Sequence, residues 1–143
     1  MQEKNLLNDQ LLYDYIEKNN KLNCKELGRI RNIIKNHPKK INISSDQQLK
    51  LIGLIIELLC PQKILEIGTF LGYATAYFAH ISNNNCLVYS IERDQESFNC
   101  AKELLSSIIT SGKIRLFHDD ASSCMQSFNE NHEKFDLIYI DAN

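Results

Sequence analysis

The chain has 143 residues, of which 43% are hydrophobic and 24% charged, and its formal net charge is −2. This length is that of about one domain, and the composition is typical of a soluble globular protein. The nearly balanced charge and the scattered basic residues predict no nucleic-acid surface.

The cysteines and the amino terminus indicate a compartment. The five cysteines are odd in number and widely spaced, so neither a disulfide framework nor a zinc site is favoured, and we expect buried thiols. The start, Met-Gln-Glu-Lys-Asn, lacks the basic and apolar parts of a signal peptide. The most apolar run, 51–60, contains Glu57 and is too short to span a membrane. We therefore predict a cytoplasmic protein without a membrane partner.

Three segments ahead of the first predicted strand carry apolar residues at helical spacing. They are 8–18 with Leu11, Leu12, Tyr15 and Ile16, 24–36 with Leu27, Ile30, Ile33 and Ile34, and 46–59 with Leu49, Ile52, Ile56 and Leu59. Pro38 ends the second helix, and Ser44, Ser45 and Asp46 offer N-cap side chains to the third, which should pack on the sheet. We expect one domain over 1–143, with amino-terminal helices over 1–45 and the main fold over 46–143.

Short apolar runs and helical segments alternate through the rest of the chain. Strands are predicted at 64–67, 87–91, 114–117 and 135–140, and helices at 72–81, between Asp94 and Ser111, and at 121–128. Four such alternations predict an α/β fold with a doubly wound parallel sheet.

Each predicted strand ends in an acidic residue. These acids are Glu66, Glu92, Asp119 with Asp120, and Asp141. A single acid of this kind is more commonly a solvated loop charge. Ligands of doubly wound sheets bind beyond the carboxyl ends of the strands, so four acids in phase favour a binding site.

Residues 63–76 read Lys-Ile-Leu-Glu-Ile-Gly-Thr-Phe-Leu-Gly-Tyr-Ala-Thr-Ala and predict a sharp turn from strand to helix. Gly68 and Gly72 lack a Cβ, so the turn can adopt strained dihedrals and a ligand can lie against the backbone. Glu66 offers a carboxylate to an amine or hydroxyl. An alternative is that the glycines only allow the strand to turn into the helix.

Glu92 lies 20 positions after Gly72, at a strand end where a carboxylate can accept both hydroxyls of a ribose. This arrangement serves any adenine nucleoside cofactor. The glycine spacing differs from the G-x-G-x-x-G dinucleotide fingerprint, but the residues alone leave both NAD and S-adenosylmethionine (AdoMet) open.

Three motifs follow one another in the chain: Ile-Ser-Ser-Asp-Gln-Gln (43–48), Leu-Glu-Ile-Gly-Thr-Phe-Leu-Gly-Tyr-Ala-Thr (65–75) and Phe-Asp-Leu-Ile-Tyr-Ile-Asp-Ala-Asn (135–143). Together they resemble the divalent-cation-dependent, class I AdoMet O-methyltransferase family of the caffeoyl-CoA and catechol type. The resemblance covers the whole chain and implies a Rossmann-like fold with sheet order three-two-one-four. It also implies methyl transfer from AdoMet to a hydroxyl of a small, catechol-like acceptor, with a divalent cation such as Mg²⁺.

The resemblance further implies roles for individual residues. The cofactor-binding residues would be Ser44, Glu66, Gly68, Thr69, Phe70, Gly72, Ala74, Glu92, Asp120, Ala121 and Asn143. Glu66 would face the methionine amino group, Glu92 the ribose hydroxyls, and Asp120 with Ala121 the adenine edge. Ala74 replaces the usual serine, so one bond to the methionine carboxylate would be missing. Asp141 matches the first metal-binding aspartate, and Asn143 replaces the second acid.

The family's chains continue past this point with a general-base lysine, further metal ligands and the remaining strands. We therefore expect this chain to keep the AdoMet-binding half without being a competent methyltransferase by itself. Strand 135–140 would be an apolar sheet edge, which predicts a homo-oligomer or other association through that strand. Two further readings stay open: a non-catalytic AdoMet-binding or protein-interaction module, and a nicotinamide-dependent oxidoreductase domain.

Overall fold

The computed structural model describes residues 24–38 and 44–142. The helix predicted at 8–18 and Asn143 lie outside these ranges. The described elements are α2 (Lys25–Lys35), α3 (Asp46–Leu59), β1 (Lys63–Ile67), α4 (Tyr73–Ile81), β2 (Leu87–Glu92), α5 (Gln95–Leu104), α6 (Ser106–Thr110), β3 (Ile114–His118), α7 (Ala121–Glu130) and β4 (Leu137–Ile140). Among them, no helix is long and apolar enough to cross a membrane.

The four strands form one parallel sheet in the order β3-β2-β1-β4, which confirms the predicted topology. Ile67 of β1 pairs with Ile91 of β2 and with Ile140 of β4, so these strands end side by side. Glu92 likewise pairs with His118 at the end of β3. The acids that follow the strands are therefore brought to one edge of the sheet.

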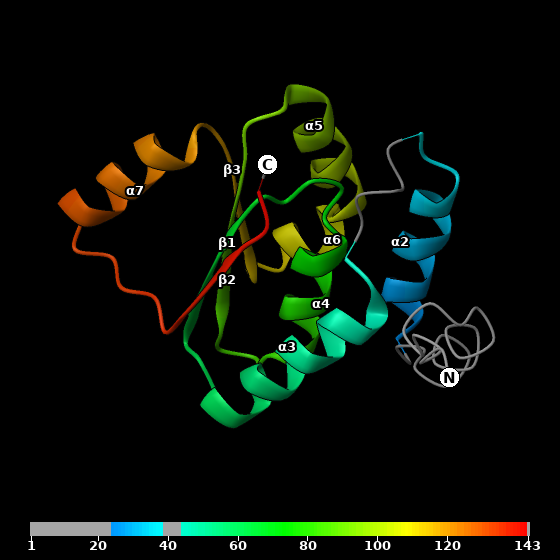
Figure 1. Ribbon diagram of the computed structural model, residues 1–143, viewed down its shortest axis with the longest axis horizontal. Helices are drawn as coiled ribbons and strands as arrows, with labels where there is room; N and C mark the ends of the chain where they lie inside the picture. The colour runs from blue at the N-terminus through cyan, green and yellow to red at the C-terminus, as the bar shows by residue number, and fades with distance from the viewer. Residues whose placement is uncertain (1–23, 39–43, 143) are drawn as a thin grey trace, which may run out of the picture.

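Helices cover both faces of the sheet, as a doubly wound fold requires. In Figure 1, α7 lies on one face, and α2 to α6 lie on the other. Helix α4 is the central element of the larger layer, because it contacts α2, α3 and β2 and every residue from Tyr73 to Ala79 is buried. Across the sheet, Phe128 of α7 packs edge-on against Tyr89 of β2.

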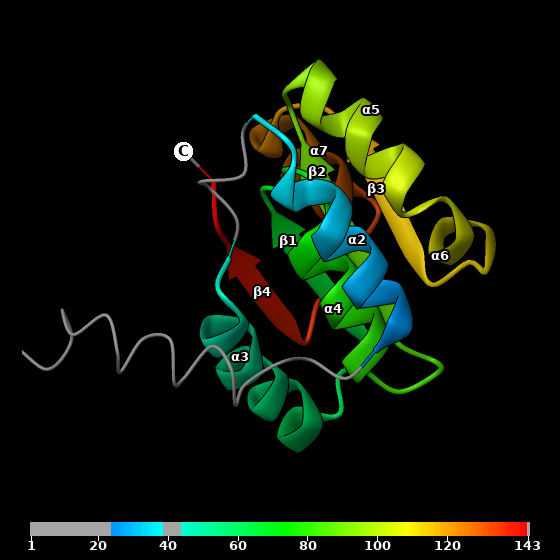
Figure 2. The ribbon, with the colours of Figure 1, turned by 90° about the vertical axis from the view of Figure 1, so that its right-hand side faces the viewer.

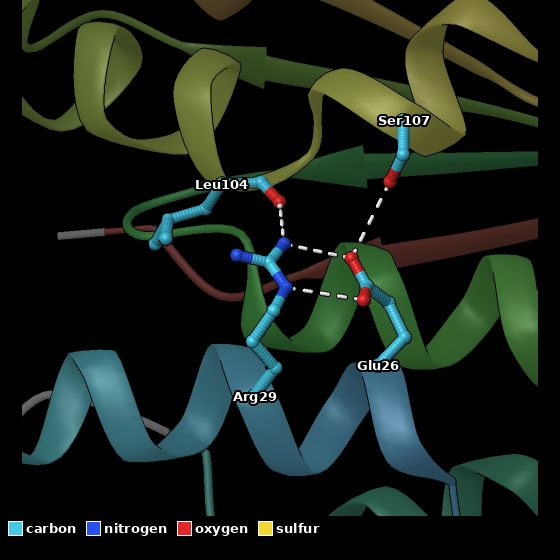
Figure 3. A network of polar contacts seen from close by, with 4 residues as sticks. All are labelled: Glu26, Arg29, Leu104 and Ser107. Atoms are coloured by element: carbon cyan, nitrogen blue, oxygen red, sulfur yellow. Dashed lines mark hydrogen bonds and ion pairs between the residues drawn. The ribbon is translucent and has the colours of Figure 1, made fainter.

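The single helix predicted between Asp94 and Ser111 is wrong, because α5 and α6 are separate helices with a break at Leu105. The Leu105 side chain is fully buried against Gly72, where a Cβ would lie 2.8 Å from Leu105 Cδ1. Arg29 of α2 donates to the carbonyl of Leu104 at 2.9 Å, as Figure 3 shows. These tertiary contacts hold the break.

Figure 3 also shows how α2 is attached to this break. Arg29 pairs with Glu26 on its own helix, and Ser107 of α6 donates to Glu26 at 3.3 Å. Helix α2 therefore stabilises the α5–α6 junction from outside, with Leu27, Ile30 and Ile34 buried on its inner side.

The fourth strand is shorter than predicted and starts at Leu137 instead of residue 135. Phe135 packs with Phe128 beside α7, and Asp136 accepts hydrogen bonds from the amides of Gln62 and Lys63 at 2.8 and 2.9 Å. The side chains of both residues therefore anchor the segment that leads into β4. Ile138 and Ile140 are 48% and 69% exposed.

Two predictions of burial need correction. Leu59 of α3 was expected to face the sheet but is 54% exposed, because Gly53 lies on the inner side of the helix between Leu49 and Ile56. The cysteines were expected to be buried, yet this holds only for Cys86 and Cys124, and Cys60 is exposed. Within the described residues the five cysteines form no disulfide.

Candidate functional site

A hollow of about 410 Å³ opens at the carboxyl ends of the strands. It is lined by Ile67, Gly68, Phe70, Ile91, Glu92, Arg93, Asp94, Ser97, Asp119, Asp120, Ala121, Asp141 and Ala142. Its size is within the range of small-molecule sites. Acids that follow β2, β3 and β4 reach it, whereas Glu66, at the end of β1, does not.

The lining of this hollow is acidic. It includes five carboxylates, and Arg93 is the single Lys or Arg side chain among the described residues that line it. Such a surface attracts cationic groups and repels phosphates, because clefts lined by one sign of charge concentrate ions of the opposite sign. A positively charged ligand fits this hollow better than a pyrophosphate.

The turn between β1 and α4 contains three residues with left-handed backbone dihedrals. Gly68, Phe70 and Gly72 have φ values of 101°, 51° and 84°. A side chain is unfavourable in this region, so Phe70 must be held there by its surroundings. Its amide donates to Glu92 Oε2 at 2.7 Å, which supplies that constraint.

Gly68 and Gly72 are required to be glycine by different neighbours. A Cβ on Gly68 would lie 2.2 Å from the backbone oxygen of Asp141, so only glycine fits where the turn meets the end of β4. Gly72 lines no described hollow, and its missing Cβ makes room for Leu105. Both glycines thus have a packing reason, and Gly68 also lines both hollows.

Glu92 joins two parts of the site. Its Oε2 accepts from the amide of Phe70, and its Oε1 accepts from the amide of Asp94 at 2.8 Å. A carboxylate has about four acceptor positions, so Glu92 can accept further hydrogen bonds from ligand hydroxyls. The two backbone amides thus hold the Glu92 side chain beside the hollow, and its carboxylate can still accept hydrogen bonds from a ligand.

Glu66 lies beneath the turn and is completely buried. Thr75 of α4 and Ser90 of β2 both donate to its Oε2, and its Oε1 has no hydrogen-bond partner among the described residues. Thr69 extends this network through a contact between its hydroxyl and that of Ser90. The acid therefore connects the turn with β2 and α4.

Burial raises the pKa of Glu66 to about 8, because a charged carboxylate loses its hydration there. The hydrogen bonds from Ser90 and Thr75 act in the opposite direction. Negative charge on Asp141 and Glu92 favours the protonated form as well. In the absence of a cation, a neutral Glu66 carboxylic acid is therefore expected at neutral pH.

A second hollow of about 30 Å³ is lined by Ser44, Gly68, Thr69, Phe70, Leu71, Tyr73, Ala74 and Asp141. Ser44 and Ala74, which were predicted at the methionine end, are among these residues. Ser44 donates to Asp141 Oδ2 at 3.1 Å, and the Tyr139 hydroxyl approaches the same oxygen at 3.2 Å. Gln48 donates in turn to the Tyr139 hydroxyl at 2.9 Å. The structure thus brings together Ser44, Ala74 and Asp141, which are far apart in sequence.

A cation would find an incomplete set of ligands here. In residues 24–38 and 44–142, no three His, Cys, Asp or Glu side chains are grouped as metal ligands. Asp141 offers one carboxylate, whereas hard divalent cations take six or more oxygen ligands. The described residues therefore do not form a metal site on their own.

Asp120 begins α7 and accepts from the amide of Ser122 at 2.8 Å. This hydrogen bond lowers the pKa of Asp120, so the carboxylate is charged at the rim of the hollow. Ala121 follows on the same rim. Their predicted place at the adenine edge stays a prediction.

Several residues of the site were missed by the sequence reasoning. Arg93, Asp94, Ser97 and Ala142 line the large hollow. The signal for Arg93 and Asp94 was their position directly after β2, where residues necessarily reach the ligand edge. A polar Ser90 within an otherwise apolar strand was the signal for the network around Glu66.

A family model described as O-methyltransferase matches residues 17–143. The chain belongs to this O-methyltransferase family. Its relatives include a probable caffeoyl-CoA O-methyltransferase of Arabidopsis thaliana, with 24% identity over 97% of this chain and 62% of the relative. A catechol O-methyltransferase B of Danio rerio is 22% identical over 67% of this chain and 37% of the relative.

Solved structures of O-methyltransferases and related enzymes share the fold. The methyltransferase PaMTH1 of Podospora anserina, bound to S-adenosylhomocysteine (SAH), has a TM-score of 0.81 and 21% identity over 93% of this chain and 56% of its own. TomG of Streptomyces achromogenes, in complex with AdoMet, has a TM-score of 0.75 and 22% identity over 91% and 59%. The chain thus spans about three fifths of the length of the O-methyltransferases it matches.

Proposed function

We propose that this chain is a cytoplasmic, single-domain member of its family that binds AdoMet and takes part in methyl transfer to a hydroxyl oxygen. Glu92 would accept the ribose hydroxyls, and the turn at Gly68, Thr69 and Phe70 would lie along the methionine part. Ser44 and Ala74 would be at the methionine end, as their position around the small hollow supports.

The acidic lining of the large hollow is the observation that carries this proposal. AdoMet has a sulfonium and an ammonium group against one carboxylate, so it is attracted to a site with five carboxylates and one arginine. The pyrophosphate of NAD would be repelled by the same side chains. Charge therefore favours AdoMet over a nicotinamide cofactor, a distinction that glycine spacing alone did not make.

The acceptor and the cation are the finer parts of the proposal. Relatives named caffeoyl-CoA and catechol O-methyltransferases support a small acceptor that carries neighbouring hydroxyls. Asp141 would supply one carboxylate to a divalent cation such as Mg²⁺. Additional ligands must come from outside the described residues, so we derive no step through the metal.

Binding of SAH and NAD, measured by isothermal titration calorimetry, tests the cofactor assignment. We expect SAH to bind and Glu92→Ala to weaken it about 100-fold, because hydrogen bonds to a charged group each contribute about 1.5–3 kcal/mol. Glu103→Gln, an exposed acid on α5, is the matched control and should bind as the wild type does. Tighter binding of NAD than of SAH would contradict the proposal, as would full affinity in Glu92→Ala.

We also expect self-association through β4. Ile138 and Ile140 are exposed on this strand, and its outer side pairs with no described strand. Unpaired strand edges of this kind recruit other chains.

A further inference from the structure

A buried acid joins three helices beside the small hollow. Asp46, the first residue of α3, is 3% exposed. Its Oδ1 accepts from the hydroxyl of Tyr73 at the start of α4 at 2.8 Å, and its Oδ2 pairs with the guanidinium of Arg31 on α2. We call these three residues the Asp46 network. Helices α2, α3 and α4 are therefore connected at one carboxylate.

The direction of the hydrogen bonds in the Asp46 network is fixed. Burial raises the pKa of Tyr73, and the hydrogen bond to Asp46 acts in the same direction. The Tyr73 hydroxyl therefore keeps its proton and donates it to Asp46. Arginine has only donors, so each carboxylate oxygen of Asp46 faces a donor. Hydrogen bonds to an ionised group are stronger than neutral ones, so this contact holds the starts of α3 and α4 together firmly.

The start of a helix does not by itself account for a buried acid at this position. Ser45 is the N-cap of α3 and accepts from the amide of Gln48 at 3.2 Å. An acid in the first turn also interacts favourably with the helix dipole, but an exposed carboxylate would do so equally well. Burial of a carboxylate is unfavourable unless the group is paired. The inward position of Asp46 is therefore explained by its contacts with α2 and α4.

The Asp46 network reaches the small hollow and not the large one. Tyr73 lines the small hollow, and so does Ser44, which lies two residues before Asp46. Ser44 in turn donates to Asp141, and Figure 2 shows α3 beginning beside β4. Neither Ser44 nor Tyr73 lines the large hollow. A change in the Asp46 network should therefore move the walls of the small hollow and leave the large hollow in place.

We propose that the Asp46 network positions the walls of the small hollow for the amino-acid end of the cofactor, with Asp46 and Tyr73 as positioning residues. This inference rests on the proposed function, in which Ser44 and Ala74 lie at the methionine end and Glu92 accepts the ribose hydroxyls. The hydrogen bond of Ser44 to β4 is exposed and contributes little by itself. The buried charge of Asp46 supplies the stronger attachment.

Two ligands separate the two ends of the site. SAH carries the amino-acid end, whereas methylthioadenosine has the same nucleoside and thioether but ends in a methyl group. In isothermal titration calorimetry we expect Tyr73→Phe to weaken SAH about tenfold and methylthioadenosine by less than about twofold, because only SAH reaches the small hollow. Asp46→Asn removes the charge and should weaken SAH by at least about the same factor.

Tyr77→Phe is the matched control. Tyr77 is as buried as Tyr73 and lies about one turn further along α4. Its hydroxyl lies against Gly53 of α3, and it lines neither hollow. The variant loses a buried hydroxyl between the same two helices and should bind both ligands as the wild type does.

The ratio of the two affinities distinguishes a positioning role from a purely structural one. Equal weakening of both ligands in Tyr73→Phe would overturn the proposal, as would an unchanged preference for SAH. Tyr73→Phe keeps the ring and the pair between Asp46 and Arg31, so it decides the question even where Asp46→Asn does not fold. A wild type that binds neither ligand would contradict the proposed function itself, and this inference with it.

Discussion

The ends of β1 and β2 and the end of β4 line one site, and they differ in how they are supported. Three consecutive residues of β1 and four of β2 are buried, whereas β4 alternates between half-buried and exposed positions. Glu92 is held by two backbone amides, but Asp141 is held by two hydroxyl groups on the surface. The part of the site formed by β1 and β2 is thus buried, whereas the part formed by β4 is exposed.

Gly68→Ala would disrupt both sides at once and should have the largest effect. The new Cβ would meet the backbone of Asp141, and a side chain at φ 101° is strained as well. We expect a loss of about 3 kcal/mol or more in the free energy of unfolding, together with loss of SAH binding. Urea denaturation and calorimetry would measure these effects.

Gly28→Ala is the control for that variant. A Cβ at Gly28 would meet nothing within 4 Å, and the residue lies inside α2. The change should stabilise the protein by about 0.5–1 kcal/mol without affecting ligand binding. A similar loss of stability in both variants would show that the contact with Asp141 is unimportant.

Glu66 should make the stability of the folded protein depend on pH. Its pKa rises from 4.5 to about 8 on folding, so between these values the folded protein keeps a proton that the unfolded chain has released. Stability should therefore fall as pH rises from about 4.5 to about 8 and then become level. Glu66→Gln is neutral at every pH. In this variant the melting temperature should no longer show the fall with pH that Glu66 causes.

The control for Glu66→Gln is again Glu103→Gln. Its melting temperature should depend on pH as that of the wild type does, because Glu103 is exposed on α5. An unchanged slope in Glu66→Gln would mean that Glu66 is ionised in the folded protein and neutralised by a partner. Glu66→Ala should be less stable than Glu66→Gln at pH 6, since alanine leaves Thr75 and Ser90 without their acceptor.

Ile140→Lys tests self-association through the exposed edge of β4. Ile140 is 69% exposed at the end of β4, and a lysine on an edge strand opposes pairing with another strand. We expect self-associated species to disappear in light scattering while SAH affinity stays the same. Persistence of the larger species would place that contact elsewhere.

Tyr139→Phe should have the smallest effect. It removes the hydroxyl that lies between Gln48 and Asp141 but keeps the edge-on contact of the ring with Phe78 at 5.2 Å. We expect a loss of about 1 kcal/mol in stability and a slightly weaker affinity for SAH. Tyr89→Phe removes a hydroxyl bonded to Arg115 at 2.8 Å on the other face and should change stability alone.

Most of the fold could be predicted from the sequence. Short apolar runs that alternate with segments of helical spacing specify a parallel sheet and the edge at which it binds ligands. Glu92 and Asp141 could be assigned to that edge for the same reason, since Glu92 ends one strand and Asp141 directly follows another. The break at Leu105 could not be predicted, because the local pattern continues through it and the cause lies in contacts with Gly72 and Arg29.

The details of the site were less predictable for a related reason. Whether Glu66 points into the hollow or beneath the turn depends on the hydroxyls of Thr75 and Ser90, which come from two other elements. The orientation of α3 was ambiguous as well, because its apolar residues occupy more than one side of the helix. Leu59 was assigned to the core on that account and is exposed.

Two of the three left-handed positions of the turn should respond differently to mutation. At Phe70 a glycine would relieve a backbone strain of about 1–2 kcal/mol but would increase the freedom of the unfolded chain by a comparable amount, so exchange is nearly neutral. At Gly68 any side chain would meet the backbone of Asp141, so no neighbouring substitution can compensate. A substitution is therefore expected to be tolerated by the fold at Phe70 and to disrupt it at Gly68, two residues away.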